Sequence, residues 1–191
     1  MFTERCVEVD SFRIRYMEAG SGRPVVALHH AGALELSRAH ELLAERYRVI
    51  AFEVPESAQT VLNAIRVIGL DSFNLWSVSS GTPLALWVAM AAPDAVEALV
   101  LEAPRHPEAE DELGRINIPT LVVFGTRDTM VPPETGRIYR HRLPNCHYVL
   151  VYDAGHAVGA ERPEAFTQLV SDFLERREAF IVSERSSRLY P

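Results

Sequence analysis

The stretch FNLWSVSSGTPLALWVAMAAP, residues 73–93, joins an apolar run to a helical one through a turn of small residues. Phe73 to Val78 is typical of a buried strand, and Thr82 to Ala92 predicts a mostly apolar helix. The turn between them, Ser77-Val78-Ser79-Ser80-Gly81, would expose one side chain at the top of a sheet. That side chain is Ser79, and the residues two positions before and after it are small, as close passage of strand and helix requires.

Short strands and helices alternate on both sides of this turn. Strands are expected at Val7–Asp10, Phe12–Met17, Pro24–His29, Tyr47–Val54, Val96–Leu101, Thr120–Gly125 and His147–Tyr152. Helical spacing occurs within Ser37–Tyr47, Val61–Ile68, Glu134–Leu143 and Phe166–Leu174. We expect the first two strands to form an antiparallel hairpin at the edge of the sheet. The alternation predicts an α/β protein with a mostly parallel central sheet and helices on both faces.

Length and composition set the broad class. The 191 residues predict a single domain over residues 1–178, followed by a C-terminal tail over residues 179–191. A net charge of −7 argues against nucleic-acid binding and against docking on anionic lipid. No apolar run is long enough to span a bilayer, and the N-terminus does not resemble a signal peptide. We therefore expect a cytoplasmic protein with neither nucleic acid nor membrane as a partner.

The cysteines and histidines suggest no metal site. Cys6 and Cys146 are too far apart in sequence to form a disulfide framework or a zinc motif, so each is expected to be a small buried apolar residue. The histidines lack the spacing of metal ligands. The sequence predicts no cofactor and no metal.

Three polar residues follow predicted strands. Ser79 comes first, Asp128 ends the segment Gly125-Thr126-Arg127-Asp128, and His156 ends Ala154-Gly155-His156. Open α/β sheets form their sites at the carboxyl ends of strands, so these side chains can meet. A serine hydroxyl becomes a nucleophile only beside a base. Each residue alone also has a structural interpretation, as a turn serine, a solvated carboxylate or a loop histidine, and Asp153 is a second candidate for the acid.

From about Val7 to Arg177 the chain resembles the α/β-hydrolase fold enzymes. The resemblance rests on PVVALHH at 24–30, YRVIAF at 47–52, SVSSG at 77–81, ALVLEAP at 98–104, IPTLVVFGTRD at 118–128, DAGH at 153–156 and RPEAF at 162–166. It implies that Ser79 is the nucleophile, Asp128 the acid and His156 the base of a catalytic triad. It also implies an oxyanion hole made by the backbone N–H groups of Ser80 and Ala31.

The substrate side of the site departs from the family pattern. The family usually has His-Gly in the first oxyanion loop, where this chain has His29-His30. His30 is assigned to the substrate site, where it either projects into the pocket or lies on its rim, and Met130 and Val158 are expected to line the same site. Many members also insert a helical cap, whereas residues 105–117 form only a short acidic segment with no core-forming pattern. We therefore expect no cap domain and a cleft open to small acyl substrates.

The resulting functional hypothesis is a serine hydrolase that cleaves small carboxylic esters or thioesters through an acyl-enzyme on Ser79. Two alternatives remain open. One is a cofactor-free lyase or acyl transferase that uses the same three residues. The other is a non-catalytic binding module, which the departure at His30 favours and the intact set of Ser79, Asp128 and His156 disfavours. An exposed apolar edge is also compatible with a homodimer.

Overall fold

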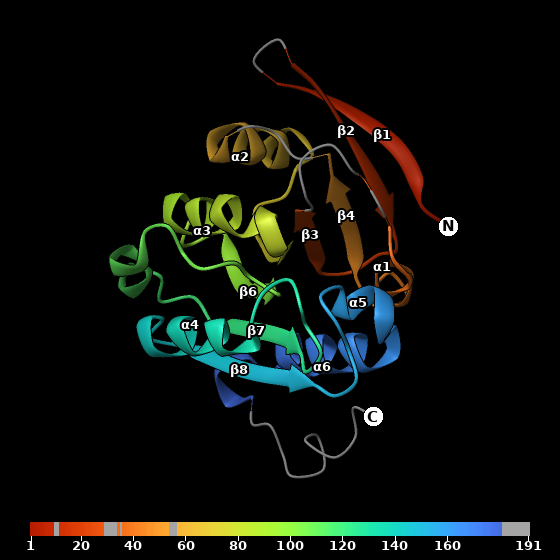
Figure 1. Ribbon diagram of the computed structural model, residues 1–191. Coiled ribbons are helices and arrows are strands. Elements are labelled where there is room, and N and C mark those ends of the chain that lie inside the picture. The colour runs from red at the N-terminus through yellow and green to blue at the C-terminus, as the bar shows by residue number, and fades with distance from the viewer. Residues whose placement is uncertain (10–11, 29–33, 35, 54–56, 181–191) are drawn as a thin grey trace.

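A computed structural model describes residues 1–9, 12–28, 34, 36–53 and 57–180 of the chain (Figure 1). The strands are β1 (Thr3–Val9), β2 (Phe12–Ala19), β3 (Pro24–Leu28), β4 (Arg48–Phe52), β5 (Phe73–Val78), β6 (Val96–Glu102), β7 (Thr120–Gly125) and β8 (Cys146–Val151). The α-helices are α1 (Arg38–Leu43), α2 (Ala58–Val67), α3 (Thr82–Ala91), α4 (Gly136–Arg142), α5 (Val158–Glu161) and α6 (Pro163–Arg176). Short 3-10 helices are η1 (Ser79–Gly81), η2 (Glu110–Arg115), η3 (Pro133–Thr135) and η4 (Arg177–Ala179).

The strands form one sheet in the order β1-β2-β4-β3-β5-β6-β7-β8. Strand β2 pairs antiparallel with both β1 and β4, while the remaining pairs from β4 to β8 are parallel. The predicted edge hairpin and the mostly parallel sheet are therefore confirmed. Parallel strands direct their carboxyl ends to one edge of the sheet, so the loops after β5, β6, β7 and β8 meet there.

Helices cover both faces of the sheet, as predicted (Figure 1). One core cluster joins the sheet to α2, α3 and α4 through residues such as Ile65, Leu86 and Tyr139. The other joins it to α1, α5 and α6 through Trp76 and Phe166, among others. Because both faces are covered, the central strands read as continuous apolar runs rather than as alternating ones.

The segment between β6 and β7 contributes to the core, which corrects one expectation. Leu113 and Ile116 are each only 2% exposed, although residues 105–117 showed no core-forming pattern. The short helix η2 buries isolated side chains instead of a periodic stripe, and periodicity cannot reveal such positions. This connection lies entirely within the described residues and holds no inserted domain.

The edges of the molecule give a second correction and one addition. Cys146 is buried as expected, but Cys6 is exposed. Cys6 lies on the edge strand β1, where alternate side chains face solvent. Phe180 lies just beyond the predicted domain end at residue 178, yet it is buried against Phe173 and His147. Of the predicted tail, residues 181–191 lie outside the described residues. No helix in the described part of the chain has the length and apolarity to cross a membrane.

Candidate active site

Ser79 lies on a sharp turn between β5 and α3. Its φ of 47° places a residue with a side chain in the left-handed region. Such a conformation costs about 1–3 kcal/mol and persists only where the surrounding structure fixes it. Ser77 and Thr82 are buried on either side of the turn, with their hydroxyl oxygens 3.4 Å apart. Small residues therefore allow the strand and the helix to pass close together, as the sequence predicted.

The buried Asp128 and the partly buried His156 form a hydrogen-bonded pair. The Oδ1 atom of Asp128 accepts hydrogen bonds of 2.9 Å from the backbone N–H groups of Met130 and Val131. Its Oδ2 atom lies 2.8 Å from Nδ1 of His156. The carboxylate thus holds the proton of the imidazole on Nδ1 and leaves Nε2 as the basic nitrogen.

The loop that carries His156 is fixed from two sides. A Cβ atom on Gly125 would lie 2.2 Å from the carbonyl oxygens of Ala154 and Gly155, so only glycine permits this close approach of β7. On the other side, the Glu161 carboxylate accepts hydrogen bonds from the backbone N–H groups of Gly155, at 2.8 Å, and Ala157, at 3.3 Å. Both amides next to His156 in sequence are therefore bound by one carboxylate.

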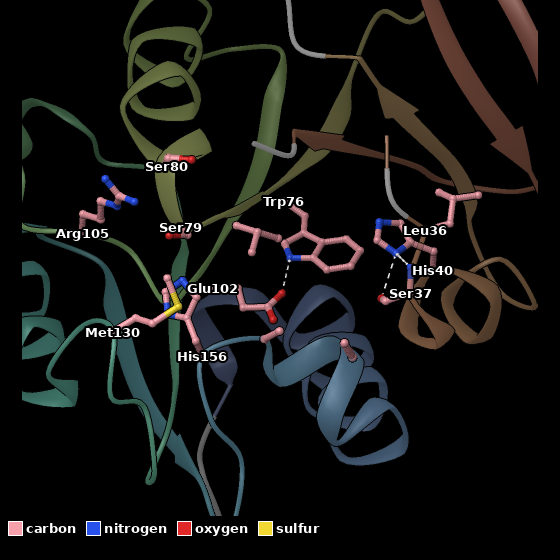
Figure 2. A pocket seen from close by; sticks show the side chains of 13 residues that line it. Leu36, Ser37, His40, Trp76, Ser79, Ser80, Glu102, Arg105, Met130 and His156 are labelled. Atoms are coloured by element: carbon pink, nitrogen blue, oxygen red, sulfur yellow. Dashed lines mark hydrogen bonds between the residues drawn. The ribbon is translucent and has the colours of Figure 1, made fainter. Parts of the chain in front are cut away.

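A cavity of about 490 Å³ contains Ser79, Ser80 and His156 in its lining. Figure 2 shows Ser79 and His156 between two groups of side chains, Arg105 and Met130 on one side and Trp76, Glu102 and His40 on the other. Met130, which was expected to line the substrate site, is 68% exposed and lines this cavity. The structure therefore brings four of the predicted residues, Ser79, Ser80, Met130 and His156, to one cavity, with Asp128 behind His156.

Glu102 and His40 also line this cavity, and neither was among the predicted site residues. Glu102 accepts hydrogen bonds from Nε1 of Trp76, at 3.0 Å, and from the backbone N–H of Gly159, at 2.8 Å. Burial raises the pKa of this carboxyl to about 7. The ring of His40 lies 4.4 Å from that of Trp76. The sequence did contain a signal for this buried acid, because Glu102 is a glutamate at the end of the apolar run that forms β6.

The remaining predicted residues lie elsewhere. Val158 is fully buried in the core cluster that also holds Phe166, and it does not line the cavity. His30 and Ala31 lie outside the described residues. Asp153 forms ion pairs with Arg127 and Arg162, so the carboxylate that contacts His156 is Asp128. Within the described ranges, no three histidine, cysteine, aspartate or glutamate side chains are grouped as a metal site requires.

Comparisons with known proteins agree with this architecture. The Abhydrolase_4 family model, described as TAP-like protein, matches residues 89–179. A pimeloyl-[acyl-carrier protein] methyl ester esterase of Neisseria meningitidis serogroup B is 35% identical over 95 residues, which are 50% of this chain and 33% of the relative. The match therefore spans about a third of the relative's length.

Two solved structures match most of the chain. A membrane phospholipase A described as a bacterial virulence factor has a TM-score of 0.83 at 21% identity, covering 91% of this chain and 86% of the other. Carboxylesterase CesB from Bacillus subtilis has a TM-score of 0.81 at 15% identity, covering 91% of this chain and 92% of the other. The strand order, the turn at Ser79 and these matches identify the chain as an α/β-hydrolase-fold protein.

Proposed function

We propose that this protein is a serine hydrolase that cleaves small carboxylic esters or thioesters through an acyl-enzyme on Ser79. The observation that carries the proposal is the Asp128–His156 hydrogen bond, which orients an imidazole at the same cavity as the Ser79 turn. The esterase relative from Neisseria supports ester cleavage as the class of reaction. The fold by itself would not, because it hosts many functions.

The reaction would use each residue in one role. Nε2 of His156 takes the proton of the Ser79 hydroxyl while Oγ attacks the substrate carbonyl, and the imidazolium then gives that proton to the leaving alcohol or thiol. Asp128 stabilises the imidazolium and keeps the tautomer fixed. Water then attacks the acyl-enzyme with His156 as the base, which releases the carboxylic acid and restores Ser79.

Backbone N–H groups would stabilise the oxyanion. Ser80 follows the nucleophile at the cavity, and its N–H is the first proposed donor. We propose Ala31 as the second donor, although it lies outside the described residues. One such donor lowers the barrier by about 3–4 kcal/mol. The β6–β7 connection holds only the short helix η2, and this supports small acyl groups as the substrates.

Labelling with a fluorophosphonate, read by intact mass and peptide mapping, tests the proposal. We expect one adduct on Ser79, together with turnover of a short-chain nitrophenyl ester. Ser79→Ala should abolish both, whereas Ser80→Ala should keep the adduct because only the backbone of Ser80 is used. Asp128→Asn should lower kcat by roughly 1,000- to 10,000-fold, since the imidazole would lose its tautomer control.

Three results would contradict the proposal. Labelling that persists in Ser79→Ala would show that another residue is the nucleophile. A folded protein that gives neither adduct nor turnover would favour the binding-module alternative. Product formed without incorporation of labelled water would instead indicate a lyase or an acyl transferase.

A further inference from the structure

Arg105 lies at the cavity that contains Ser79, on the segment that follows β6. Figure 2 shows its side chain on the side of the cavity where Ser80 lies. Arg105 also borders a second cavity of about 120 Å³, which is lined mainly by apolar residues such as Trp87 and Leu113. Its side chain therefore lies at the junction between the catalytic cavity and a small apolar one.

The backbone of Arg105 is held in place. The hydroxyl of Tyr139 donates a 2.5 Å hydrogen bond to the carbonyl oxygen of Arg105. Tyr139 is itself buried, and burial raises its pKa, so its hydroxyl keeps the proton that it donates. Pro104 and Pro107 lie close on both sides in sequence and restrict the chain further. The fixed backbone places the exposed Arg105 side chain at the cavity that also contains Ser79 and Ser80.

No carboxylate neutralises this guanidinium within the described part of the chain. Of the acidic residues that follow it, Glu110 pairs with Arg142 at 2.6 Å and Glu112 with Arg115 at 2.5 Å. Glu108 borders the small apolar cavity together with Arg105 but forms no ion pair with it. Glu102, the acid that lines the same cavity, already accepts two hydrogen bonds.

Among the described residues that line the cavity, Arg105 is the one with a permanent positive charge. The Arg105 side chain therefore attracts an anion to this cavity, although the protein as a whole has a net charge of −7.

We propose that Arg105 binds an anionic group of the substrate, a carboxylate or a phosphate that is separate from the scissile ester. A guanidinium presents several N–H donors in a planar fork that matches both oxyanions. The substrate class would be esters or thioesters that carry a second, negatively charged group. This inference rests on the proposed function, because it assigns the anion to a substrate cleaved at Ser79.

The experiment compares esters that carry a second, anionic group with neutral counterparts. Monoethyl adipate carries a carboxylate in its acyl part, and ethyl adipamate is its neutral amide isostere. A phosphoethyl butanoate carries phosphate in its alcohol part, and hydroxyethyl butanoate is the neutral counterpart. The kcat/KM ratio of anionic to neutral ester is measured for the parent, Arg105→Gln, Arg105→Lys and a control, Arg66→Gln. Arg66 is an exposed arginine on α2 that does not line the cavity, so the control removes the same charge from a remote position.

We expect the parent to prefer at least one anionic ester, and the pair that shows the preference identifies the anion as carboxylate or phosphate. Arg105→Gln should lower that ratio by roughly 10- to 50-fold, mainly through KM, as loss of a charged hydrogen-bonded pair predicts. Arg105→Lys should lower it less, and Arg66→Gln should keep it.

The inference would be overturned if the parent showed a ratio of anionic to neutral kcat/KM near one, or if Arg66→Gln lowered that ratio as much as Arg105→Gln. In either case, turnover of the neutral esters and the Ser79 adduct would still support the proposed function. Loss of the adduct and of all turnover in the folded parent would overturn both.

Discussion

Replacing Glu102 with glutamine tests whether a buried carboxyl of the site titrates near neutral pH. Burial raises the pKa of Glu102 from its ordinary value of 4.5 to about 7 in the folded protein. The N–H groups of Trp76 and Gly159 favour the charged form, but the loss of water around the carboxyl disfavours it more strongly. Between these two pKa values, Glu102 should therefore be protonated in the folded protein and ionised in the unfolded chain.

The sign of the effect on stability follows from this difference. Between about pH 4.5 and about pH 7 the folded state holds more protons than the unfolded state, so the free energy of unfolding decreases as pH rises. The two pKa values are about 2.5 pH units apart, which at about 1.36 kcal/mol each gives a total loss of about 3 kcal/mol. Roughly 2–3 kcal/mol of it should occur between about pH 5 and about pH 8.5.

Urea unfolding followed by circular dichroism measures this loss. Glutamine cannot ionise, so the stability of Glu102→Gln relative to the parent should rise by roughly 2–3 kcal/mol between about pH 5 and about pH 8.5. The amide also disturbs the hydrogen bond from Gly159, but this cost is the same at both pH values and cancels.

Glu97→Gln, on the same strand, is the matched control. Hydrogen bonds from Ser72 and Arg177 lower the pKa of Glu97, so its stability contribution is lost only as pH falls through that lower pKa. This control should show no such change across the window. If the parent and Glu102→Gln lose stability in parallel, Glu102 does not hold a proton near neutral pH and the reasoning is wrong.

Three other changes give separable results. Glu161→Gln should lower kcat on a short ester by roughly 10-fold with little change in KM, because the amides beside His156 lose a charged acceptor; an unchanged kcat would contradict this. Gly125→Ala should lower the free energy of unfolding by more than about 2 kcal/mol, since its Cβ meets two carbonyl oxygens, and a thermal melt would show it. A thiol reagent should label the exposed Cys6 in the native protein but Cys146 only after unfolding, because burial also raises the pKa of Cys146 to about 12. Labelling of both cysteines in the native protein would refute the burial of Cys146.

Local patterns were sufficient to predict most of the fold. The Ser79 turn could be predicted because its cause is local: a strand, a helix and small residues between them. The pairing of Asp128 with His156 is not local, and the sequence supported it through chain order and resemblance. The structure adds the distance between the two side chains and the ion pairs that divert Asp153 from His156.

The residues that sequence reasoning missed are those whose role depends on burial by distant segments. Glu102 looks like one charge in an apolar strand, and its partners lie 26 and 57 positions away in sequence. Val158 follows His156 by two positions, but the helix that begins there turns it into the core. Proximity in sequence to a site residue is therefore weaker evidence for a place in the cavity lining than position on an exposed loop, as Met130 illustrates.

The strand order explains why Glu102 belongs with the site. Strand β6 lies between β5, which leads to Ser79, and β7, which leads to Asp128. In the sheet register Glu102 pairs with Val78, the residue directly before Ser79. Its carboxyl binds an indole from β5 and an amide of α5, three positions after His156. The buried Glu102 carboxyl thus connects the strand that leads to Ser79 with the segment that follows His156, and a change of its charge near neutral pH should act on both.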